Sequence, residues 1–398
     1  MHNKRPIAEH IYYVGVNDRQ KSFFENYLPL PEGISYNSYL IIDEKVVLID
    51  TVDIAFADVY FGKIGAILKD RPIDYLIVNH MEPDHAGVIG LLKLKYPSIQ
   101  IVGNSRTFDM LKGYFGICNQ LLEVKEGSSL SLGERTLSFY MAPMVHWPEV
   151  MVTYEQNNQI LFSADAFGSF GTLDGDYLGC LICNDKFRNE LRRYYACIVG
   201  KYGVQVQAAL KKLASLEIQT ICPAHGPVWT QEINKILNLY DKWSRYEAEE
   251  DGVVVAFGSM YGNTQQLAEA VAEGLVSGGI KNVIIHNVSK TDTSFILSDI
   301  FKHKGLIIGS PTYMNGIYPM VEKLLNAISH RGIKNRLYSC FGSFTWAGAA
   351  VKHLTAFADT MGWELVGEPV ENKQAVFAEK YEEAFKLGQT FAERIISK

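Results

Sequence analysis

The pattern of apolar and polar positions changes once along the chain, near residue 250. Before that point short apolar runs alternate with polar turns, and two of them flank Asp43–Lys45 in a pattern that predicts a β-hairpin. Segments with apolar residues three and four positions apart predict helices at 56–68, 86–95, 189–213 and 233–250. Hairpin-rich halves with interleaved helices predict an α/β sandwich, with helices outside two packed sheets.

After Gly252 the pattern becomes a regular alternation of strands and helices. Strands are predicted at 253–257, 283–288, 305–308, 337–341 and 364–368, and helices at 265–276, 295–300, 319–331, 347–361 and 375–397. Five such pairs predict a doubly wound parallel sheet. The fold class is therefore α/β in both parts, and we expect two domains, residues 1–250 and 251–398.

Composition narrows the classes of function. The net charge of −6 argues against a nucleic-acid partner, which requires a basic face. No apolar stretch approaches the length of a membrane span, and the N-terminal residues lack a signal-peptide core, so we expect a cytoplasmic protein without a membrane partner. The six cysteines suggest free thiols. Cys180 and Cys183 form a C-x-x-C without a second pair, which favours structural thiols over a redox or metal role.

One stretch, 79–90, is dense in potential metal ligands. It reads N-H-M-E-P-D-H-A-G-V-I-G and follows the apolar run 74–78, which is typical of a buried strand. The ligands therefore stand on the loop at the carboxyl end of a strand, where α/β proteins tend to place their chemistry. So many polar groups beside an apolar strand are costly unless they are paired or coordinated. These residues are His80, Glu82, Asp84 and His85.

Three further residues stand where later predicted strands end: His146, Asp165 and His225. Each alone would be read as a surface residue, a hydrogen-bonded residue or a helix cap. Together with the dense stretch they give four imidazoles and three carboxylates, a set that suits iron, zinc or manganese. With one carboxylate bridging, seven ligands would hold two metals roughly 3.5–4 Å apart.

The second predicted domain begins with a phosphate-binding pattern. Its first strand leads into a polar, glycine-containing turn and then a helix, so that backbone N–H groups and hydroxyls face an anion. The turn lacks the lysine of a P-loop and the G-x-G-x-x-G of a dinucleotide fold, which favours a monophosphate. Its S-x-Y-G-N-T string is similar to the flavodoxin phosphate loop. The residues are Ser259, Met260, Tyr261, Gly262, Asn263 and Thr264.

The loops after the third and fourth strands complete a predicted FMN site. In a sheet of order 2-1-3-4-5 a flavin lies at the carboxyl ends of strands one, three and four. Tyr313 and Trp346 are expected to cover the isoalloxazine faces, and backbone groups of Thr312, Asn315 and Gly348 to bond its edges. The alternative is that these are ordinary glycine-rich turns with exposed aromatics. The loop residues are Pro311, Thr312, Tyr313, Met314, Asn315 and Gly316, followed by Ser343, Phe344, Thr345, Trp346, Ala347 and Gly348.

These motifs together resemble a known family. The H-x-[HE]-x-D-H pattern with distant His, Asp and His looks like the metallo-β-lactamase superfold, whose hydrolases mostly carry His at the third position and favour zinc. With Glu82 there and a flavodoxin-like second domain, the chain resembles the flavodiiron proteins (A-type flavoproteins). The resemblance implies one iron on His80, Glu82 and His146, a second on Asp84, His85 and His225, and Asp165 bridging.

The resemblance also implies a function. FMN would pass electrons to the diiron centre, which would reduce O2 to water, NO to N2O, or both. The additional negative charge of Glu82 should favour cycling between Fe(II) and Fe(III). Family members form head-to-tail homodimers or dimers of dimers, and a separate rubredoxin or similar protein would supply the electrons. Phe24, Trp147, Tyr194 and Tyr195 are candidates for the apolar wall around the substrate.

Two other hypotheses remain open at this point. One is a zinc hydrolase fused to a flavodoxin-like domain, and Glu82 speaks against it. The other is a flavodoxin-type electron carrier whose first domain is inert.

Overall fold

The computed structural model describes residues 4–179 and 185–397. The chain divides into two compact units. The first unit comprises Met1–Tyr195 with Val204–Asp241, and the second comprises Ala196–Gly203 with Lys242–Lys398.

The first unit contains two seven-stranded sheets. In the first sheet β8 pairs with β7 as the predicted hairpin, and β8 to β11 run parallel to one another. The strand order is β1 (Pro6–Ala8), β2 (Ile11–Tyr13), β7 (Tyr39–Ile42), β8 (Val46–Ile49), β9 (Tyr75–Ile77), β10 (Gln100–Gly103) and β11 (Leu121–Glu123).

The second sheet begins as an antiparallel meander and continues through a parallel pairing of β15 with β17. Its order is β12 (Ser129–Ser131), β13 (Thr136–Met141), β14 (Met151–Glu155), β15 (Ile160–Phe162), β17 (Thr220–Cys222), β18 (Val228–Trp229) and β16 (Leu178–Gly179). Two small antiparallel pairs stand apart from both sheets: β3 (Val16–Asp18) with β6 (Ile34–Tyr36), and β4 (Phe23–Phe24) with β5 (Leu28–Pro29).

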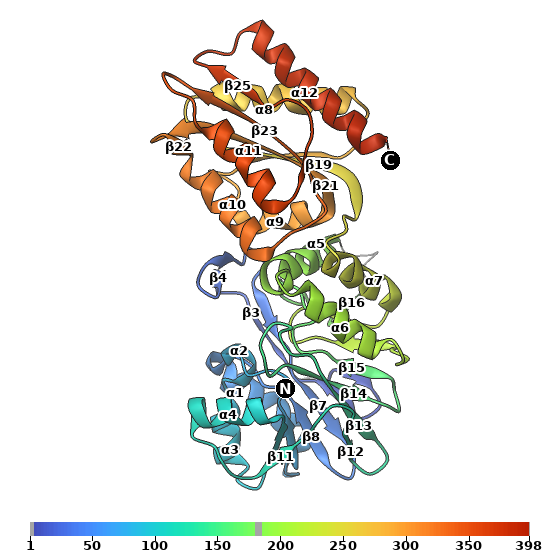
Figure 1. The fold of residues 1–398 in the computed structure, drawn as a ribbon. Helices are drawn as coiled ribbons and strands as arrows, with labels where there is room; N and C mark the ends of the chain where they lie inside the picture. The colour runs from blue at the N-terminus through green and yellow to red at the C-terminus, as the bar shows by residue number, and fades with distance from the viewer. Residues whose placement is uncertain (1–3, 180–184, 398) are drawn as a thin grey trace. The chain divides into compact units, whose positions relative to one another are not determined.

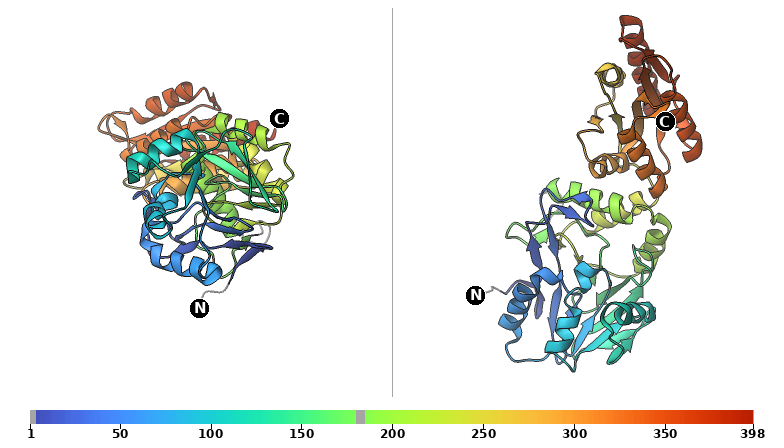
Figure 2. Two further views of the ribbon diagram at one scale, coloured as in Figure 1. Left: turned by 90° about the horizontal axis from the view of Figure 1, so that it is seen from below. Right: turned by 90° about the vertical axis from the view of Figure 1, so that its left-hand side faces the viewer.

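Helices cover the outer faces of these two sheets (Figure 1, Figure 2). Residues on β8 and β15 are buried throughout, so each strand contributes to the core between the layers. The predicted αββα sandwich is thereby confirmed. The helical elements are η1 (Ile54–Phe56), α1 (Ala57–Leu68), α2 (Pro83–Ala86), α3 (Ile89–Lys95), α4 (Ser105–Phe115), α5 (Asp185–Tyr194), α6 (Gly203–Leu213) and α7 (Ile233–Ser244).

The continuous helix predicted at 189–213 is wrong. The structure has α5, a π-helical turn η2 (Tyr195–Val199), a break, and then α6. Two glycines explain the interruption, because a Cβ at Gly200 would meet the carbonyl oxygen of Ala196 at 2.8 Å and one at Gly203 would meet that of Ser244 at 2.4 Å. The helix predicted at 86–95 is likewise divided, with α2 ending at Ala86 and α3 beginning at Ile89.

The second unit is built on a parallel sheet of order 2-1-3-4-5, as predicted. Figure 1 shows α8 and α12 on one face of this sheet and α9, α10 and α11 on the other. The strands are β20 (Val283–Asn287), β19 (Glu250–Phe257), β21 (His303–Tyr313), β23 (Leu337–Phe344) and β24 (Glu364–Leu365), with β22 (Gly316–Ile317) on β21 and β25 (Val370–Lys373) on β23. The helices are α8 (Asn263–Ser277), α9 (Thr293–Lys302), α10 (Pro319–Arg331), α11 (Ala350–Met361) and α12 (Ala378–Ile396).

Three element boundaries differ from the prediction, one in α7 and two in the parallel sheet of the second unit. The helix predicted at 233–250 ends at Ser244, and Glu250 already belongs to β19. The third strand continues past Ile308 to Tyr313. The fifth strand is split into β24 and β25, and between them Gly367 takes a positive φ of 72° that turns the chain.

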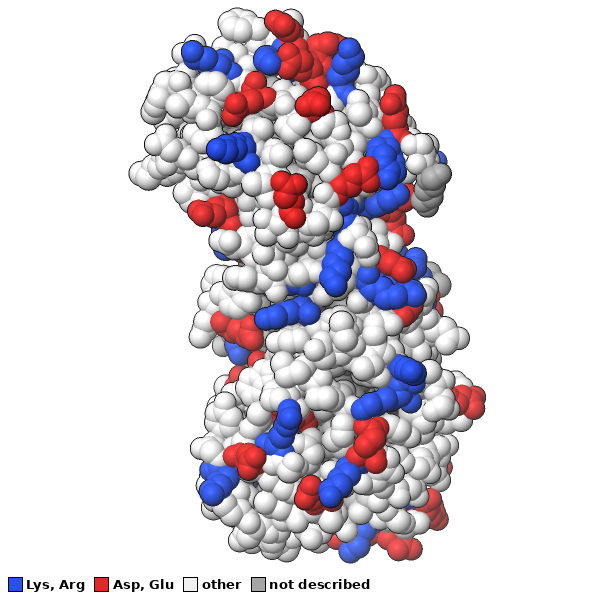
Figure 3. All heavy atoms as spheres, viewed as in Figure 1, with Lys and Arg blue, Asp and Glu red and all other residues white. Residues whose placement is uncertain are grey.

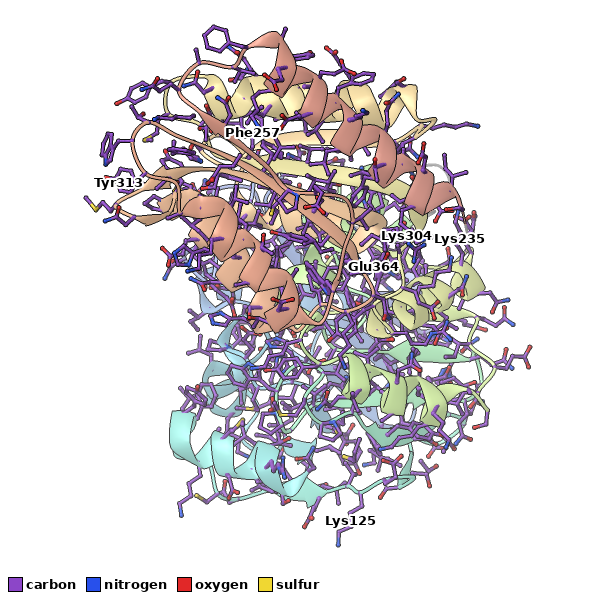
Figure 4. All side chains as sticks on the ribbon, turned by 45° about the horizontal axis from the view of Figure 1, so that its top comes forward. Lys125, Lys235, Phe257, Lys304, Tyr313 and Glu364 are labelled. Carbon is purple, nitrogen blue, oxygen red and sulfur yellow. The ribbon has the colours of Figure 1, made fainter. Side chains whose placement is uncertain are left out.

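Buried leucine, valine and phenylalanine side chains hold α8 and α12 against the sheet. Leu267, Val271 and Phe391 are each 0% exposed. Burial of each such side chain contributes roughly 1.5–3 kcal/mol. At the end of β19, Phe257 lies in this interior, whereas Tyr313 lies at the edge of the unit (Figure 4).

Among the described residues no helix is long and apolar enough to cross a membrane. On the face shown in Figure 3, acidic and basic side chains are interspersed.

Candidate metal centre and flavin site

The seven predicted metal ligands meet inside the first unit. They stand after four strands, β9, β13, β15 and β17, which bring their carboxyl ends together. Their atoms form two groups, and within each group the ligand atoms lie within 4.8 Å of one another. The first group is His80, Glu82, His146 and Asp165, the second is Asp84, His85 and His225, and all seven side chains are buried.

The first group converges on one point. The Nε2 atom of His80 lies 3.2 Å from Glu82 Oε2 and 3.2 Å from Asp165 Oδ2. The Nε2 atom of His146 lies 3.1 Å from each of the same two oxygens. Two imidazole nitrogens and two carboxylate oxygens therefore face a common centre, an arrangement that suits a first-row transition metal.

The second group meets the other oxygen of Asp165. Asp165 Oδ1 lies 3.2 Å from His85 Nε2 and 3.6 Å from His225 Nε2. Asp84 Oδ2 lies 3.3 Å from His225 Nε2, and Asp84 Oδ1 lies 3.5 Å from His85 Nε2. The two oxygens of Asp165 thus face different groups, which is the geometry of a bridging carboxylate.

Polar atoms of the second group, and the Asp165 oxygen that faces it, are buried without a hydrogen-bond partner among the described residues: both carboxylate oxygens of Asp84, Nε2 of His85, Nε2 of His225 and Oδ1 of Asp165. Burying such atoms without a partner is costly. A cation would satisfy all of them at once. The residues present therefore fit a pair of divalent metals.

Residues that sequence reasoning missed hold these ligands in place. Glu149 Oε1 accepts hydrogen bonds from His80 Nδ1 at 2.8 Å and from the Met81 N–H at 2.9 Å. The Ser35 carbonyl oxygen lies 2.7 Å from His225 Nδ1. Each contact places a proton on Nδ1 and leaves the Nε2 lone pair facing the centre. The only sequence signal for Glu149 is its place in H-W-P-E, three residues after His146.

Asp50 fixes the start of the ligand-rich loop. Its carboxylate accepts from the backbone N–H groups of Asn79 at 2.7 Å and His80 at 3.3 Å. It also accepts from the Asn79 side chain at 3.2 Å. Complete burial raises the pKa of Asp50 to about 6. The sequence signal for Asp50 was its position at the end of the apolar run V-L-I-D. Asp50 follows a strand there, just as the metal ligands follow theirs.

Protons and metal ions compete for the same ligand atoms at this centre. Burial alone would lower the pKa of His146 and of His85, but nearby carboxylates raise both to about 9. Hydrogen bonds from His146 and His80 overcome burial and lower the pKa of Glu82 to about 2. Protons bound to these imidazoles occupy the same nitrogen lone pairs that a metal requires, so metal binding must release them.

Aromatic side chains line the centre, and three of the four predicted wall residues touch a ligand. The ring of Phe24 lies 5.6 Å from that of His225, and Tyr194 lies 5.5 Å from His225. Trp147 lies 5.3 Å from His80. Tyr195 instead packs edge-on against Tyr240, with ring centroids 5.0 Å apart.

The predicted flavin residues surround a cavity of about 480 Å³ in the second unit. All three predicted loops contribute to its lining, at the carboxyl ends of β19, β21 and β23. The lining residues are Ser259, Met260, Tyr261, Asn263, Thr264, Pro311, Thr312, Tyr313, Met314, Asn315, Ser343, Phe344, Thr345, Trp346 and Ala347. Of the predicted residues, Gly262, Gly316 and Gly348 are not part of this lining.

Local contacts shape the phosphate loop at the start of α8. Gly262 has a φ of 95° and precedes the first turn of the helix, and its N–H donates to Ser259 Oγ at 3.1 Å. Thr264 Oγ1 and Ser343 Oγ lie 2.8 Å apart, so the first and third loops are joined. The helix N-terminus offers free N–H groups to an anion, which fits the predicted monophosphate.

The exposed aromatic rings at this cavity are positioned for stacking. Trp346 is 85% exposed and Tyr313 is 37% exposed. Both rings line the flavin cavity, and contiguous exposed apolar side chains can mark a ligand or partner site.

The C-x-x-C motif of Cys180 and Cys183 lies outside the described residues.

Comparison with known proteins identifies relatives of both folds. Residues 34–226 match the family described as ODP family beta lactamase, and residues 255–388 match Flavodoxin. A nitric oxide reductase of Moorella thermoacetica is 32% identical over 98% of each chain. Rubredoxin:oxygen oxidoreductase of Desulfovibrio gigas superposes with a TM-score of 0.93 at 30% identity, covering 99% of each chain. A flavodiiron protein of Giardia intestinalis also has a TM-score of 0.93, with 28% identity, covering 100% of this chain and 98% of its own.

The chain belongs to the flavodiiron proteins. The family predicted from the sequence is thereby confirmed, together with the pairing of a lactamase-like and a flavodoxin-like fold.

Within this flavodiiron protein, Glu82 is the residue that separates the metal centre from that expected of a zinc hydrolase. Its Oε2 contacts both imidazoles of the first group, so the position supplies an anion where a neutral third histidine would otherwise stand. An anionic ligand stabilises the higher oxidation state of a metal. A redox centre benefits from that effect, whereas zinc has no redox chemistry.

Proposed function

We propose that the protein is a flavodiiron reductase that reduces O2 to water, NO to N2O, or both, with electrons delivered through FMN. The observation that carries the proposal is the arrangement of Asp165, whose two oxygens face two separate ligand groups, one of which contains Glu82. The named relatives, a nitric oxide reductase and a rubredoxin:oxygen oxidoreductase, support both substrates.

When bound, FMN supplies a reservoir of up to two electrons, and a pair of irons supplies a site where a diatomic gas can bind and be reduced. The protein's own residues prepare this chemistry. Glu149 and Ser35 orient the imidazoles of His80 and His225 toward the centre. Phe24 and Tyr194 pack against His225 and keep bulk water from that side of it.

In the second unit, the start of α8 and its loop would hold the FMN phosphate. Tyr313 and Trp346 would cover the flavin ring. Thr312 Oγ1 accepts from the N–H groups of Ala349 and Ala350 at 3.0 and 3.1 Å, which fixes the second flavin loop relative to the third. Such cross-linking keeps the cavity formed before the flavin binds.

The two other hypotheses have less support. A zinc hydrolase would not require the anionic ligand Glu82. An inert first domain would not bury Asp84, His85 and His225 with ligand atoms that lack hydrogen-bond partners among the described residues.

Partners are proposed on the same basis. A rubredoxin-type protein is the electron donor, and the chain assembles as a head-to-tail homodimer, or as a dimer of such dimers. The exposed side chains of Tyr261, Met314 and Trp346, which are 90%, 85% and 85% exposed around the flavin cavity, support an interface on that rim. A cytoplasmic location is supported by Cys118, Cys222 and Cys340, which form no disulfide.

The test is a metal and flavin analysis followed by a gas pulse. Iron near two atoms per chain and FMN near one are expected, and the anaerobically reduced protein should be reoxidised rapidly by O2 or NO. The Asp165→Ala variant is the control, since it should keep FMN and lose the reaction. Purified protein that contains zinc, or reduced wild-type protein that is inert to both gases after iron reconstitution, would refute the proposal.

A further inference from the structure

The loop that carries His225 has no side chain of its own that could hold its backbone. It reads P-A-H-G-P, residues 223–227, and it connects β17 to β18. Apart from the ligand, its residues are proline, alanine and glycine, and all five are buried. Buried carbonyl groups require hydrogen-bond donors, so the donors for this loop must come from elsewhere in the fold.

Asn37 supplies most of these donors. It lies in the short connection between β6 and β7 and is 0% exposed. Its Nδ2 atom donates to the carbonyl oxygens of Pro223 at 2.9 Å and of Gly226 at 2.8 Å. Its backbone N–H donates to the carbonyl oxygen of Ala224 at 2.8 Å. One residue therefore holds the loop backbone on both sides of the ligand.

The orientation of the Asn37 amide is also fixed. The hydroxyl of Tyr13, which is buried at the end of β2, donates to Asn37 Oδ1 at 2.9 Å. Since the amide oxygen faces this donor, the NH2 group faces the two loop carbonyls. An aspartate at this position would direct an acceptor at two other acceptors, so the contact requires an amide.

The Gly226 carbonyl depends on Asn37 more than the Pro223 carbonyl does. The Pro223 oxygen also accepts from the Tyr39 hydroxyl at 2.6 Å. Among the hydrogen bonds of the described residues, the Gly226 oxygen accepts from Asn37 alone. The Gly226 N–H in turn donates to Ser35 Oγ at 2.7 Å. The backbone that directly follows the ligand is therefore held by segment 35–37.

The other ligands of the second group are held in a different way. Asp84 and His85 are adjacent residues of the short helix α2, and the His85 N–H donates to the Glu82 carbonyl oxygen at 2.9 Å. His225 reaches them from the second sheet, and its Nε2 lies 3.3 Å from Asp84 Oδ2. That spacing depends on where the His225 loop is held.

We propose that Asn37 is a positioning residue for the second metal, because it holds His225 where this imidazole completes the ligand group with Asp84 and His85. The inference rests on the metal pair of the proposed function. Without the amide, the Gly226 carbonyl would be buried without its donor, and the loop would have to move to recover one. The imidazole would move with the loop, while the two ligands on α2 stay in place.

The test measures the two metal affinities separately in Asn37→Ala. The full-length protein is stripped of metal with a chelator and titrated anaerobically with Co(II), whose visible absorption reports each binding step. One step should weaken by about 10–100-fold, the usual effect of losing a residue that supports a ligand, and the other should be unchanged. His225→Ala identifies the affected step, because half-loaded Asn37→Ala should have the same spectrum. Asn238→Ala, at an exposed asparagine of α7, is the matched control.

A milder variant keeps the test valid if Asn37→Ala fails to fold. Tyr13→Phe removes only the hydroxyl that orients the amide, and it should weaken the same step by a smaller factor. Tyr154→Phe removes another hydroxyl that donates to a backbone carbonyl, that of Glu217 at 2.6 Å, and should leave both steps unchanged.

Iron loading gives an independent readout. At limiting iron, oxidised Asn37→Ala should show the paramagnetic resonance of single high-spin Fe(III) ions, whereas a coupled iron pair in wild type is silent. Excess Fe(II) should fill the second site, remove that signal and restore gas reduction, which it would not do if Asn37 took part in the chemistry itself.

The outcomes separate this inference from the proposed function. Two affinities equal to those of wild type in Asn37→Ala, or in Tyr13→Phe if the first variant does not fold, overturn the role of Asn37. An equal loss of both affinities also overturns it, since Asn37 would then support only the fold. Wild-type protein that binds two metals but ignores O2 and NO refutes the reductase function, and the Co(II) titration still decides the role of Asn37. Wild-type protein that binds fewer than two metals refutes both.

Discussion

His80 and Glu149 form a buried pair in which Nδ1 of the imidazole and Oε1 of the carboxylate lie 2.8 Å apart. Both side chains are 0% exposed. The pair fixes which nitrogen of His80 faces the metal, and Glu149 also accepts from the Met81 N–H. The geometry of the ligand-rich loop therefore depends on a residue 69 positions away in the chain.

Glu149→Gln should weaken metal binding by about 10–100-fold, the usual effect of losing such a supporting carboxylate. The amide keeps a similar shape but removes the charge that holds the Nδ1 proton. The measurement is iron retention against a graded series of chelator concentrations. Glu123→Gln serves as the exposed control, and retention in Glu149→Gln equal to that of the control would show that the contact does not support the metal.

The metal-free protein should lose stability as pH rises from near neutral to alkaline. His85 and His146 have pKa values of about 9 in the fold, against about 6.5 in an unfolded chain. A raised pKa means that the folded state binds the proton more tightly, so the added stability is complete below about pH 6.5 and disappears as pH passes about 9. Glu82, with its pKa lowered to about 2, acts oppositely and keeps its contribution above about pH 4.5.

Thermal unfolding of chelated protein at several pH values measures this effect. The His85→Gln variant is the matched comparison, since it should flatten the alkaline decline. Metal-loaded protein should lack the decline as well, because metals replace the protons on the imidazoles. A midpoint temperature that stays constant from about pH 6.5 to about pH 9 in chelated wild type would contradict the assignment.

The convergence of the seven candidate ligands was predictable from sequence because each of them stands where an apolar run ends. His80 to His85 are dense enough to be recognised directly, and His146, Asp165 and His225 share the strand-end position. In both units the candidate functional residues lie at the ends of strands. Locating the strands in the sequence was therefore nearly sufficient to locate the candidate sites. The flavin loops followed for the same reason, since the order 2-1-3-4-5 brings strands one, three and four together at one edge.

Residues that act through tertiary contacts could not be found in this way. Glu149 is an ordinary acid in a loop, and only the contact between the loops that follow β9 and β13 places it on His80. The break between α5 and α6 was also missed, because close backbone approach at Gly200 and Gly203 outweighs the helical apolar spacing.

Trp346→Ala should weaken FMN binding with little effect on folding. The side chain is 85% exposed, so its removal costs the fold little, but a stacked aromatic pair is worth about 0.5–1.5 kcal/mol. That range corresponds to roughly a two- to twelvefold rise in the dissociation constant of FMN. Titration of flavin into deflavinated protein, followed by fluorescence quenching, measures it. Phe377→Ala, at a residue 74% exposed before α12, is the control and should bind FMN as wild type does.

Glu82→His should turn the metal centre toward zinc and away from redox chemistry. Imidazole can replace the carboxylate as a ligand, and the neighbouring His80 and His146 remain, so two metals should still bind. Replacing an anion by a neutral ligand removes one negative charge from the first metal, which destabilises Fe(III) relative to Fe(II). The reduction potential of the iron pair should therefore rise, and the ratio of zinc to iron should increase when both are offered in equal amounts. Metal analysis and a spectroscopic redox titration measure the two effects, with Glu123→His as the surface control. An unchanged potential and an unchanged metal ratio would mean that the charge of Glu82 does not tune the centre, and the distinction between a redox and a hydrolytic site would then have to reside in residues around the ligands.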